Sequence, residues 1–197
     1  MSRPRADSSR RRCSTLAFVH PVHDIEVLPN IEDFVPCVIE IPKGSHLKYE
    51  VDKPTGLLRL DRVLYSAVHY PANYGFIPRT HADDGDPLDV LVLMQEPVEP
   101  LTIVRARPLG GLRMVDEKGG DDKIVAVCID DPSFDHYGSL HSLPPHITKE
   151  LDRFFRDYKA LEGKKQESVS VGEMYGQTQA LKVIRESRAA YDRGDGR

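Results

Sequence analysis

Residues 37–60 read CVIEIPKGSHLKYEVDKPTGLLRL, and this stretch carries two signals of β-structure. The segment CVIEI (37–41) has the two-residue alternation that is typical of a strand. The segments LKYEV (47–51) and LLRL (57–60) flank KPTG (53–56), a turn with proline at its second residue position. This arrangement predicts a β-hairpin.

Short apolar runs continue beyond the hairpin, at residues 88–94, 102–106, 112–115 and 124–129. Turn residues separate these runs, and none of the connections contains a long helical crossover. The pattern therefore favours a closed antiparallel β-barrel over a parallel sheet. Between residues 69 and 78, proline and glycine predict a loop that carries Tyr70 and Tyr74.

Two helices are predicted near the end of the chain. After Pro144-Pro145, apolar residues recur on one helical face, at Ile147, Leu151, Phe154, Phe155, Tyr158 and Leu161. A second, weaker helix is expected from about Gln177 to Tyr191. The expected fold class is α+β, with residues 34–197 as a single domain and residues 1–33 as an N-terminal extension that is at least partly flexible.

Charge is unevenly distributed over the 197 residues, whose net charge is −4. The first twelve residues hold five arginines and one acid, which leaves 22 basic and 30 acidic residues and a net charge of −8 in the remainder. An acidic body argues against nucleic acid as a partner, because phosphate backbones bind basic surfaces. It is suited to metal cations.

Neither a disulfide framework nor a membrane span is predicted. The three cysteines form no CxxC pair, which indicates a reducing compartment, and the longest apolar run, residues 124–129, is too short to cross a bilayer. We therefore expect a cytoplasmic protein without a membrane partner. The Arg-rich start is more typical of a solvated tail, with organellar import as the alternative.

Two clusters of carboxylates are the strongest indication of chemistry. The first puts four acids into seven residues directly before an apolar run: Asp83, Asp84, Asp86 and Asp89. Neighbouring carboxylates repel one another, and a hard divalent cation bound by oxygen ligands compensates that repulsion. Gly85 permits an unusual turn and Pro87 stiffens it, so that the acids are held in place. An EF-hand is excluded because position 5 from Asp84 is Leu88 and no glutamate follows at position 12.

The second cluster surrounds Gly119-Gly120 and contains Asp116, Glu117, Asp121 and Asp122. Taken alone, it is typical of a hairpin turn. If both clusters meet at one end of a barrel, they form a site for two or more metals, which is suited to activating water against a phosphoryl group.

Basic and phenolic residues near these clusters are candidates for binding an anion. They are Lys48, which shares a strand face with Glu50, together with Arg62, Tyr70, Tyr74, Lys123, Tyr158 and Lys159. Each has an ordinary structural explanation as a salt bridge or a core tyrosine. As a set, they match what a polyanion bound between metal ions requires.

The segment DGDPLDV (84–90) resembles the signature of the soluble family I inorganic pyrophosphatases. Supporting motifs occur in the same order: IEIP (39–42), KYE (48–50), DR (61–62), YPANYG (70–75), Asp116-Glu117 through Asp121-Asp122-Lys123, and YK (158–159). The resemblance covers about residues 34–162. HPVHD (20–24) and residues 126–137 are most similar to the plant-type branch, and no motif follows Gly163.

The resemblance implies an OB-like five-stranded antiparallel β-barrel flanked by two C-terminal helices. It also implies hydrolysis of pyrophosphate to two phosphates by a metal-activated water. Several Mg²⁺ ions per active site are implied, with Mn²⁺ or Zn²⁺ as substitutes. The oligomeric state stays open, because prokaryotic relatives are often hexamers and plant-type relatives can be monomers.

The resemblance also implies a role for each matching residue. Asp86 is the expected general base, and Tyr74 lies near the nucleophile. The expected metal ligands are Asp84, Asp89 and Asp121 for the central pair, with Asp116, Glu40 and Glu50 nearby. The expected phosphate-binding residues are Lys48, Arg62, Lys123, Tyr158 and Lys159, with Tyr74 beside them.

Three alternatives remain at this point. One is another metal-dependent phosphohydrolase, although neither a P-loop nor a GxGxxG motif is present. A second is a non-catalytic OB-type binding protein, which the acidic body and the lack of tryptophan disfavour. The third is a histidine metal site, but His20, His23, His136, His141 and His146 match no ligand spacing and are interpreted as loop histidines.

Overall fold

The computed structural model describes residues 19–116, 119–162 and 170–194, and for residues 115, 116, 119 and 170 it describes the backbone alone. The strands are β1 (Val35–Ile41), β2 (Leu47–Val51), β3 (Leu58–Val63), β4 (Asn73–Phe76), β5 (Asp89–Leu93), β6 (Ile103–Asp116), β7 (Gly119–Cys128) and β8 (Ser170–Gly176). The helices are a short 3-10 helix, η1 (Leu140–Ser142), and two α-helices, α1 (Pro145–Asp157) and α2 (Gln177–Asp192).

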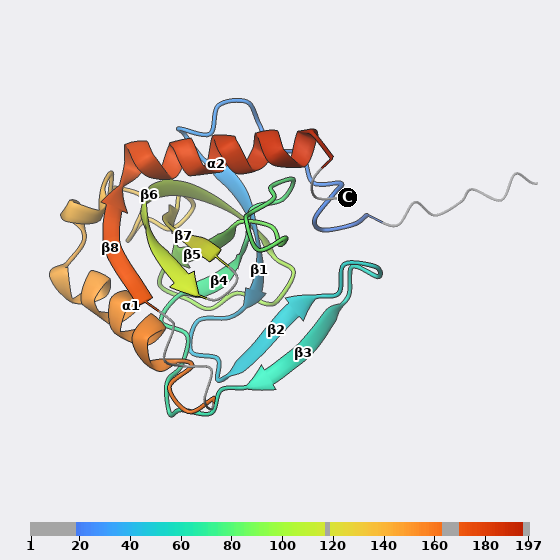
Figure 1. The fold of residues 1–197 in the computed structure, drawn as a ribbon. Helices are drawn as coiled ribbons and strands as arrows, with labels where there is room; N and C mark the ends of the chain where they lie inside the picture. Colours follow the sequence, from blue (N-terminus) through green and yellow to red (C-terminus); the bar gives the residue numbers. More distant parts are fainter. Residues whose placement is uncertain (1–18, 117–118, 163–169, 195–197) are drawn as a thin grey trace, which may run out of the picture.

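Five strands form a ring around the main core (Figure 1). Their order is β1-β4-β5-β7-β6, and β6 pairs back onto β1. β8 adds to the free part of β6, and β2 and β3 form a separate two-stranded hairpin. The ring and the two C-terminal helices confirm the predicted α+β class with a five-stranded barrel.

The ring is not wholly antiparallel, because β5 and β7 run in the same direction. β6 follows β5 in the chain but lies on the far side of β7, to which it is antiparallel. The crossover between the parallel strands is therefore β6 itself. The prediction of purely antiparallel pairing was wrong, because a strand as well as a helix can connect two parallel strands, and here β6 does so.

The expected runs at 102–106 and 112–115 belong to one strand, β6. The register of β6 against β7 shifts between Pro108 and Gly110, so a β-bulge accommodates the proline without ending the strand. A side chain at Gly110 would meet the Tyr175 carbonyl oxygen at 2.3 Å, which shows how closely β8 approaches there.

Two further strands were not predicted. Residues 73–76, expected in a loop, form β4, whose four residues are all buried between β1 and β5. Residues 170–176, after the last recognisable motif, form β8. Both gain their partners from distant parts of the chain, so local patterning does not reveal them.

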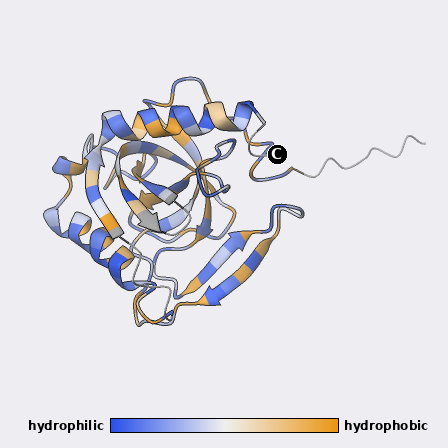
Figure 2. Cartoon of the chain, viewed as in Figure 1, coloured by the Kyte–Doolittle hydropathy of each residue, from blue (hydrophilic) through white to orange (hydrophobic). Residues whose placement is uncertain are grey.

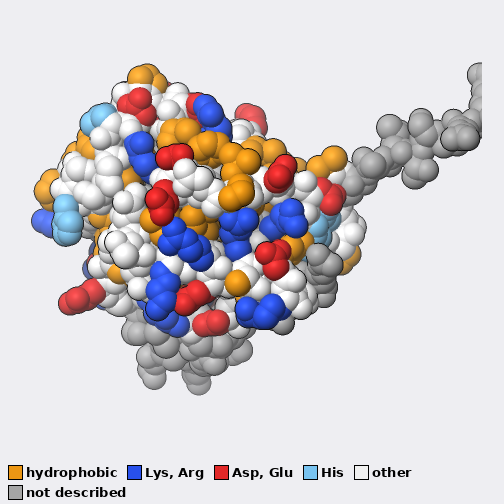
Figure 3. All heavy atoms as spheres, turned by 90° about the horizontal axis from the view of Figure 1, so that it is seen from above, with side chains coloured by type: hydrophobic (Ala, Val, Ile, Leu, Met, Phe, Trp, Pro, Cys, Tyr) orange, Lys and Arg blue, Asp and Glu red, His pale blue; other side chains and the backbone are white. Residues whose placement is uncertain are grey.

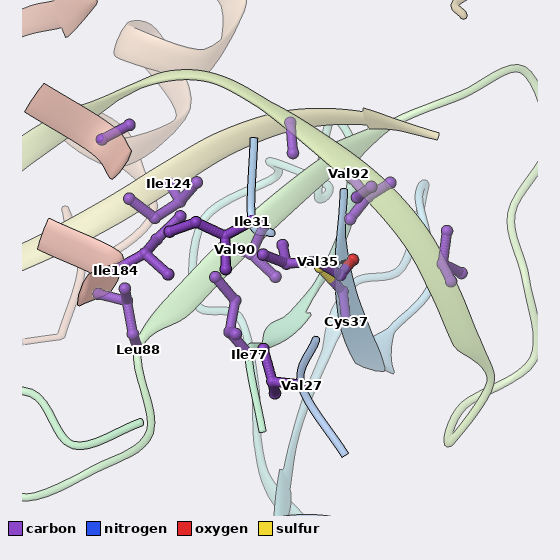
Figure 4. Packing of buried hydrophobic residues seen from close by; sticks show 14 of the residues in the cluster. Val27, Ile31, Val35, Cys37, Ile77, Leu88, Val90, Val92, Ile124 and Ile184 are labelled. Carbon is purple, nitrogen blue, oxygen red and sulfur yellow. Dashed lines mark hydrogen bonds between the residues drawn. The ribbon is translucent and has the colours of Figure 1, made fainter. Parts of the chain in front are cut away.

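The main core fills the ring and is closed by α2 (Figure 4). Apolar side chains of β1, β5, β6 and β7 point inward, and Ile184 of α2 packs onto them. Val27 and Ile31 add to this core, so part of the segment before β1, residues 19–34, is packed against the ring. We call residues 19–34 the lead-in segment.

A second core lies on the opposite face of the strands, beneath α1. Because side chains alternate along a strand, Leu91 and Val125 belong to this outer core, whereas their neighbours point into the ring. Leu151, Phe154 and Phe155 of α1 cover them. The prediction that Leu161 continues this face was wrong, since α1 ends at Asp157 and Leu161 is 65% exposed.

α2 is amphipathic, with hydrophobic residues toward the ring and hydrophilic residues outward (Figure 2). Its exposed side makes ion pairs of Lys182 with Glu186 and of Arg185 with Glu32. Basic and acidic side chains are interleaved on the face seen from above (Figure 3). Among the described residues, no helix is long and apolar enough to cross a membrane.

Candidate active site

Three charged residues of the ring lie together because of the strand register. Asp89, the first residue of β5, is opposite Lys123 of the parallel strand β7. Asp121 precedes Lys123 by two residues and so shares its face. The Lys123 ammonium donates to both oxygens of the Asp121 carboxylate, at 2.7 and 2.6 Å, and also contacts the Asp89 carboxylate. Lys123 is only 4% exposed.

The second acidic cluster is divided by β7, which begins at Gly119 and includes Asp121 and Asp122. The cluster was expected in a hairpin turn, but two of its four acids lie within the strand β7. The two residues alternate in direction: Asp121 contacts Lys123, whereas Asp122 accepts a hydrogen bond from the Tyr175 hydroxyl of β8 at 3.0 Å. Asp116 is the last residue of β6, and its side chain lies outside the described residues, as does Glu117.

Glu40 reaches the same region from β1, at a β-bulge. The register of β1 against β4 shifts between Ile39 and Ile41, which places Glu40 at the irregularity. Its carboxylate accepts a hydrogen bond from the Val51 backbone N–H of β2 at 2.6 Å. Burial, with a contribution from the nearby charge of Asp89, raises the pKa of Glu40 to about 8.

The hairpin contributes a network of alternating charge. Lys48 of β2 contacts the Glu50 carboxylate on the same face and donates to Asp61 Oδ2 of β3 at 3.0 Å. Burial acts to lower the pKa of Lys48, but its hydrogen bonds to Glu50 and Asp61 raise it above the ordinary value. The predicted turn and the shared face of Lys48 and Glu50 are both confirmed.

Arg62 of β3 connects this network to the segment that follows α1. Its guanidinium donates to Asp61 Oδ2 at 2.6 Å and, through Nε, to Glu162 Oε1 at 2.7 Å. Glu162 lies 100 residues further along the chain, after α1. No pattern in the sequence indicates Glu162, because a single acid in a polar stretch is indistinguishable from a surface residue.

Three tyrosines stand beside the charged residues. The Lys123 ammonium lies 5.9 Å from the centre of the Tyr74 ring. Tyr70 packs between Tyr74, at 5.4 Å between ring centres, and Phe154, at 4.8 Å. Tyr158 is the residue after α1, is 7% exposed, and interacts electrostatically with Lys123 and Arg62. Lys159 stacks its ammonium 5.5 Å above the Tyr158 ring.

The first acidic cluster is less compact than the sequence suggests. We call residues 83–87 the acid loop. Asp84 is close enough to Asp121 to raise its pKa, but the Asp86 carboxylate is exposed and forms an ion pair with Lys53 of the hairpin turn. Gly85 has φ +89°, a left-handed conformation that confirms the unusual turn expected of the glycine. Asp86 donates its backbone N–H to Asp84 Oδ1 at 3.1 Å.

The histidines are not all in loops. His141 lies in η1 and His146 in the first turn of α1, whereas His20 and His23 occupy a turn of the lead-in segment. The prediction of loop histidines was therefore wrong for His141 and His146. The apolar spacing that predicts α1 begins at Ile147 and so does not mark His146, and η1 is a single turn without such spacing.

The family model for inorganic pyrophosphatase matches residues 37–192, which include all but the first two residues of β1, every other strand and helix, and the whole charged network. The chain belongs to the inorganic pyrophosphatase family.

Relatives in this family include plant and algal proteins. A soluble inorganic pyrophosphatase of Oryza sativa subsp. indica is 51% identical over 172 residues, covering 87% of this chain and 79% of the relative. Soluble inorganic pyrophosphatase 2 of Chlamydomonas reinhardtii is also 51% identical over 172 residues, with 87% and 88% covered. These identities confirm the predicted similarity to the plant-type branch.

A solved inorganic pyrophosphatase from Thermus thermophilus has the same fold. Its chain superposes with a TM-score of 0.81 at 43% identity, and the match covers 85% of this chain and 97% of that one. The agreement extends the family assignment from sequence to architecture.

The carboxylates of Asp84, Asp89 and Asp121 have the chemistry that suits a hard divalent cation. In the described ranges, no group of three or more His, Cys, Asp or Glu side chains is arranged to enclose a metal ion, and the Lys123 ammonium stands between Asp89 and Asp121. Burial, together with the charges of Asp89 and Asp84, raises the pKa of Asp121 to about 6. Carboxylates that repel one another in this way are the oxygen ligands that Mg²⁺ prefers.

Proposed function

We propose that this chain hydrolyses inorganic pyrophosphate to two phosphates and that Mg²⁺ is its metal. One observation carries the proposal: a nearly buried lysine, Lys123, is held by Asp89 and Asp121 beside a second network of cations on the hairpin. A site that places carboxylates and cations side by side is complementary to a polyanion bound together with metal ions.

Asp84, Asp89 and Asp121 are the ligands proposed for the central metals. Glu40, Glu50 and Asp116 are proposed for further ions that arrive with substrate. When bound, Mg²⁺ neutralises phosphoryl oxygens and makes a neighbouring water more acidic. The raised pKa values of Asp121 and Glu40 support these assignments, because a cation offsets the repulsion that both carboxylates experience.

Five residues are proposed to bind the phosphate oxygens: Lys48, Arg62, Lys123, Tyr158 and Lys159. In the described structure, Lys48 and Arg62 are paired with carboxylates of the hairpin and with Glu162. Substrate oxygens can replace those partners without leaving a cation unpaired, because phosphate and carboxylate accept the same hydrogen bonds. The buried phenol of Tyr158 offers a neutral donor among these charges.

Asp86 is proposed as the general base that takes a proton from the attacking water, and Tyr74 as a residue near the nucleophile. An exposed carboxylate on a loop next to the metal ligands can accept that proton and pass it to solvent. Tyr74 is anchored by its contacts with Lys123 and Tyr70, so its phenol is held in place beside Asp89.

We further propose one catalytic domain, residues 34–197, that acts in the cytoplasm, with residues 1–33 as an extension. Packing of Val27 and Ile31 into the main core supports a structural contribution from the end of that extension. Import into an organelle through the Arg-rich start is the alternative location. Detection of a shortened N-terminus in an organellar fraction would favour the alternative.

Phosphate release by the purified full-length chain tests the function. Pyrophosphate is compared with ATP and a sugar phosphate, each with Mg²⁺, Mn²⁺, Zn²⁺ or EDTA, and binding of single-stranded DNA is measured in parallel. The proposal predicts release that prefers pyrophosphate and stops in EDTA. Preference for another phosphate substrate would favour a different phosphohydrolase, and DNA binding without release would favour a binding protein.

A further inference from the structure

The turn of the hairpin is held by its own hydrogen bonds and directs Lys53 toward the acid loop. Gly56 has φ +66° and donates its backbone N–H to the Asp52 carbonyl at 2.7 Å, while the Thr55 hydroxyl donates to the Asp52 carboxylate at 2.6 Å. These bonds fix the turn internally, so the direction of Lys53 follows from the hairpin. Its ammonium donates to the Gly85 carbonyl oxygen at 2.9 Å and forms an ion pair with Asp86.

Lys53 therefore binds two successive residues of the acid loop, Gly85 and Asp86. The loop has its own hydrogen bonds: Ala82 donates its backbone N–H to the Asp86 carbonyl at 2.8 Å, and Gly85 donates to the Ala82 carbonyl at 3.1 Å. Those bonds set the backbone of the loop, but they leave the Asp86 carboxylate free to rotate. In the part of the chain that the structure describes, Lys53 is the side chain that pairs with this carboxylate.

The lead-in segment holds the hairpin turn from the other side. His20 Nε2 is 2.7 Å from the Lys53 carbonyl oxygen, and His20 Nδ1 accepts the Val22 backbone N–H at 3.2 Å. Both bonds are satisfied together by the neutral tautomer with its proton on Nε2. His20 also stacks on His23, at 4.5 Å between ring centres, and His23 Nδ1 is 2.8 Å from the Tyr191 hydroxyl of α2.

These contacts connect α2, the lead-in segment, the hairpin turn and the acid loop in one continuous series. Figure 1 shows the hairpin turn on the side of the molecule where the lead-in segment and the end of α2 lie. The Val22 carbonyl also accepts the Arg79 backbone N–H at 2.9 Å, which fastens the lead-in segment to the stretch that precedes the acid loop.

We infer that Lys53 is a positioning residue for Asp86, and that His20 supports it by holding the hairpin turn. The inference rests on the proposed function of Asp86 as the base. Among the side chains that the structure describes, the Lys53 ammonium pairs with Asp86 and with none of the proposed substrate-binding cations or metal ligands, so we expect its effect on turnover to pass through the orientation of Asp86.

The exposure of this ion pair separates a positioning role from a stabilising one. The side chains of Lys53 and Asp86 are 52% and 59% exposed, and ion pairs of such exposure contribute little to folding stability. Loss of Lys53 should therefore leave the melting temperature unchanged while it lowers kcat. Misplacement of a catalytic group by about 1 Å can slow a reaction by about a hundredfold, so about a tenfold loss is expected for loss of one support.

The test compares Lys53→Met with Lys182→Met in the full-length chain. Lys182 makes an ion pair of similar exposure with Glu186 on α2, 63% and 64%, and therefore controls for the loss of one surface cation. We expect Lys53→Met to lower kcat about tenfold with KM unchanged. Lys53→Arg should restore most of the rate, and Lys182→Met should behave as wild type.

A double variant decides whether the effect passes through Asp86. If Lys53 acts by placing that carboxylate, Lys53→Met has no further effect in a chain that already carries Asp86→Asn. If the losses in kcat of Lys53→Met and Asp86→Asn multiply in the double variant, the inference is overturned. Normal turnover of the Lys53→Met single variant, measured beside an active wild-type chain, would also overturn it. A wild-type chain that releases no phosphate from pyrophosphate would instead overturn the proposed function, and the role of Lys53 with it.

Discussion

Lys123 donates hydrogen bonds to both oxygens of Asp121, at 2.7 and 2.6 Å, from a side chain that is almost completely buried. The same ammonium contacts Asp89, so one cation balances two carboxylates. The parallel pairing of β5 with β7 sets this relationship, because it puts Asp89 directly opposite Lys123. The charge balance of the proposed metal site therefore depends on a single residue of β7.

Replacement of Lys123 by methionine should destabilise the metal-free protein. Two carboxylates would be left in a low-exposure position without a cation, and the loss of one partner of a buried pair costs about 3 kcal/mol. Urea unfolding in EDTA measures this change. Addition of Mg²⁺ should restore part of the lost free energy of unfolding, because the metal replaces the missing charge. Equal instability with and without Mg²⁺ would argue against a metal site at Asp89 and Asp121.

The pH dependence of stability should reveal Glu40. Its pKa in the folded chain, about 8, is above the ordinary value of 4.5, so the folded state binds more protons than the unfolded state between these values. The free energy of unfolding should therefore fall as the pH rises from about 4.5 to about 8.

Glu40→Gln isolates this contribution. The amide oxygen can still accept the hydrogen bond from Val51, but the side chain no longer ionises. In EDTA, the variant should gain on the order of 4 kcal/mol relative to wild type between pH 5 and pH 9, because one pKa unit corresponds to about 1.4 kcal/mol. Asp121 has a shift of the same sign in both chains, so it cancels in the difference. Parallel pH profiles would show that Glu40 is not the group responsible.

Asp86→Asn tests the proposed base. Asparagine has nearly the same shape and can accept a hydrogen bond from Lys53, but it cannot take a proton. We expect kcat to fall by about a hundredfold or more, with Mg²⁺ binding retained, because general-base catalysis contributes about 10²–10⁴-fold. Calorimetric titration with Mg²⁺ provides the control. A variant of near-normal rate would remove Asp86 from this role.

Tyr158→Phe separates binding of substrate from packing of the core. The ring contacts with Phe154 and Phe155 remain in the variant, so the free energy of unfolding should change by less than about 1 kcal/mol. The KM for pyrophosphate should rise about tenfold, since a hydrogen bond to a charged group contributes about 1.5 kcal/mol or more. An unchanged KM together with a lowered melting temperature would instead assign the phenol to the core.

The local features of this fold were predictable from the sequence. The turn between β2 and β3 contains its own proline and glycine, and α1 begins at the second of two prolines and continues with a regular apolar spacing. The unusual turn of the acid loop at Gly85 was equally apparent. In each case the determining residues are neighbours in the chain, so a short window contains the whole signal.

Features that depend on distant residues were missed. β4 is buried because β1 and β5 enclose it, and its own sequence reads as a loop. The parallel pair of β5 and β7 requires knowledge of where β6 lies. The partners Arg62 and Glu162, and likewise Lys53 and Asp86, meet through tertiary structure alone, so no spacing in the sequence indicates them.

Phosphorus-31 NMR of pyrophosphate mixed with the purified chain tests most directly whether this site hydrolyses it. With Mg²⁺ present, the pyrophosphate resonance should disappear while inorganic phosphate grows to two per substrate consumed. The same mixture in EDTA, and the Asp86→Asn variant with Mg²⁺, should keep the pyrophosphate resonance over that interval. Persistence of the pyrophosphate resonance with Mg²⁺ and a folded wild-type chain would contradict the proposed hydrolysis.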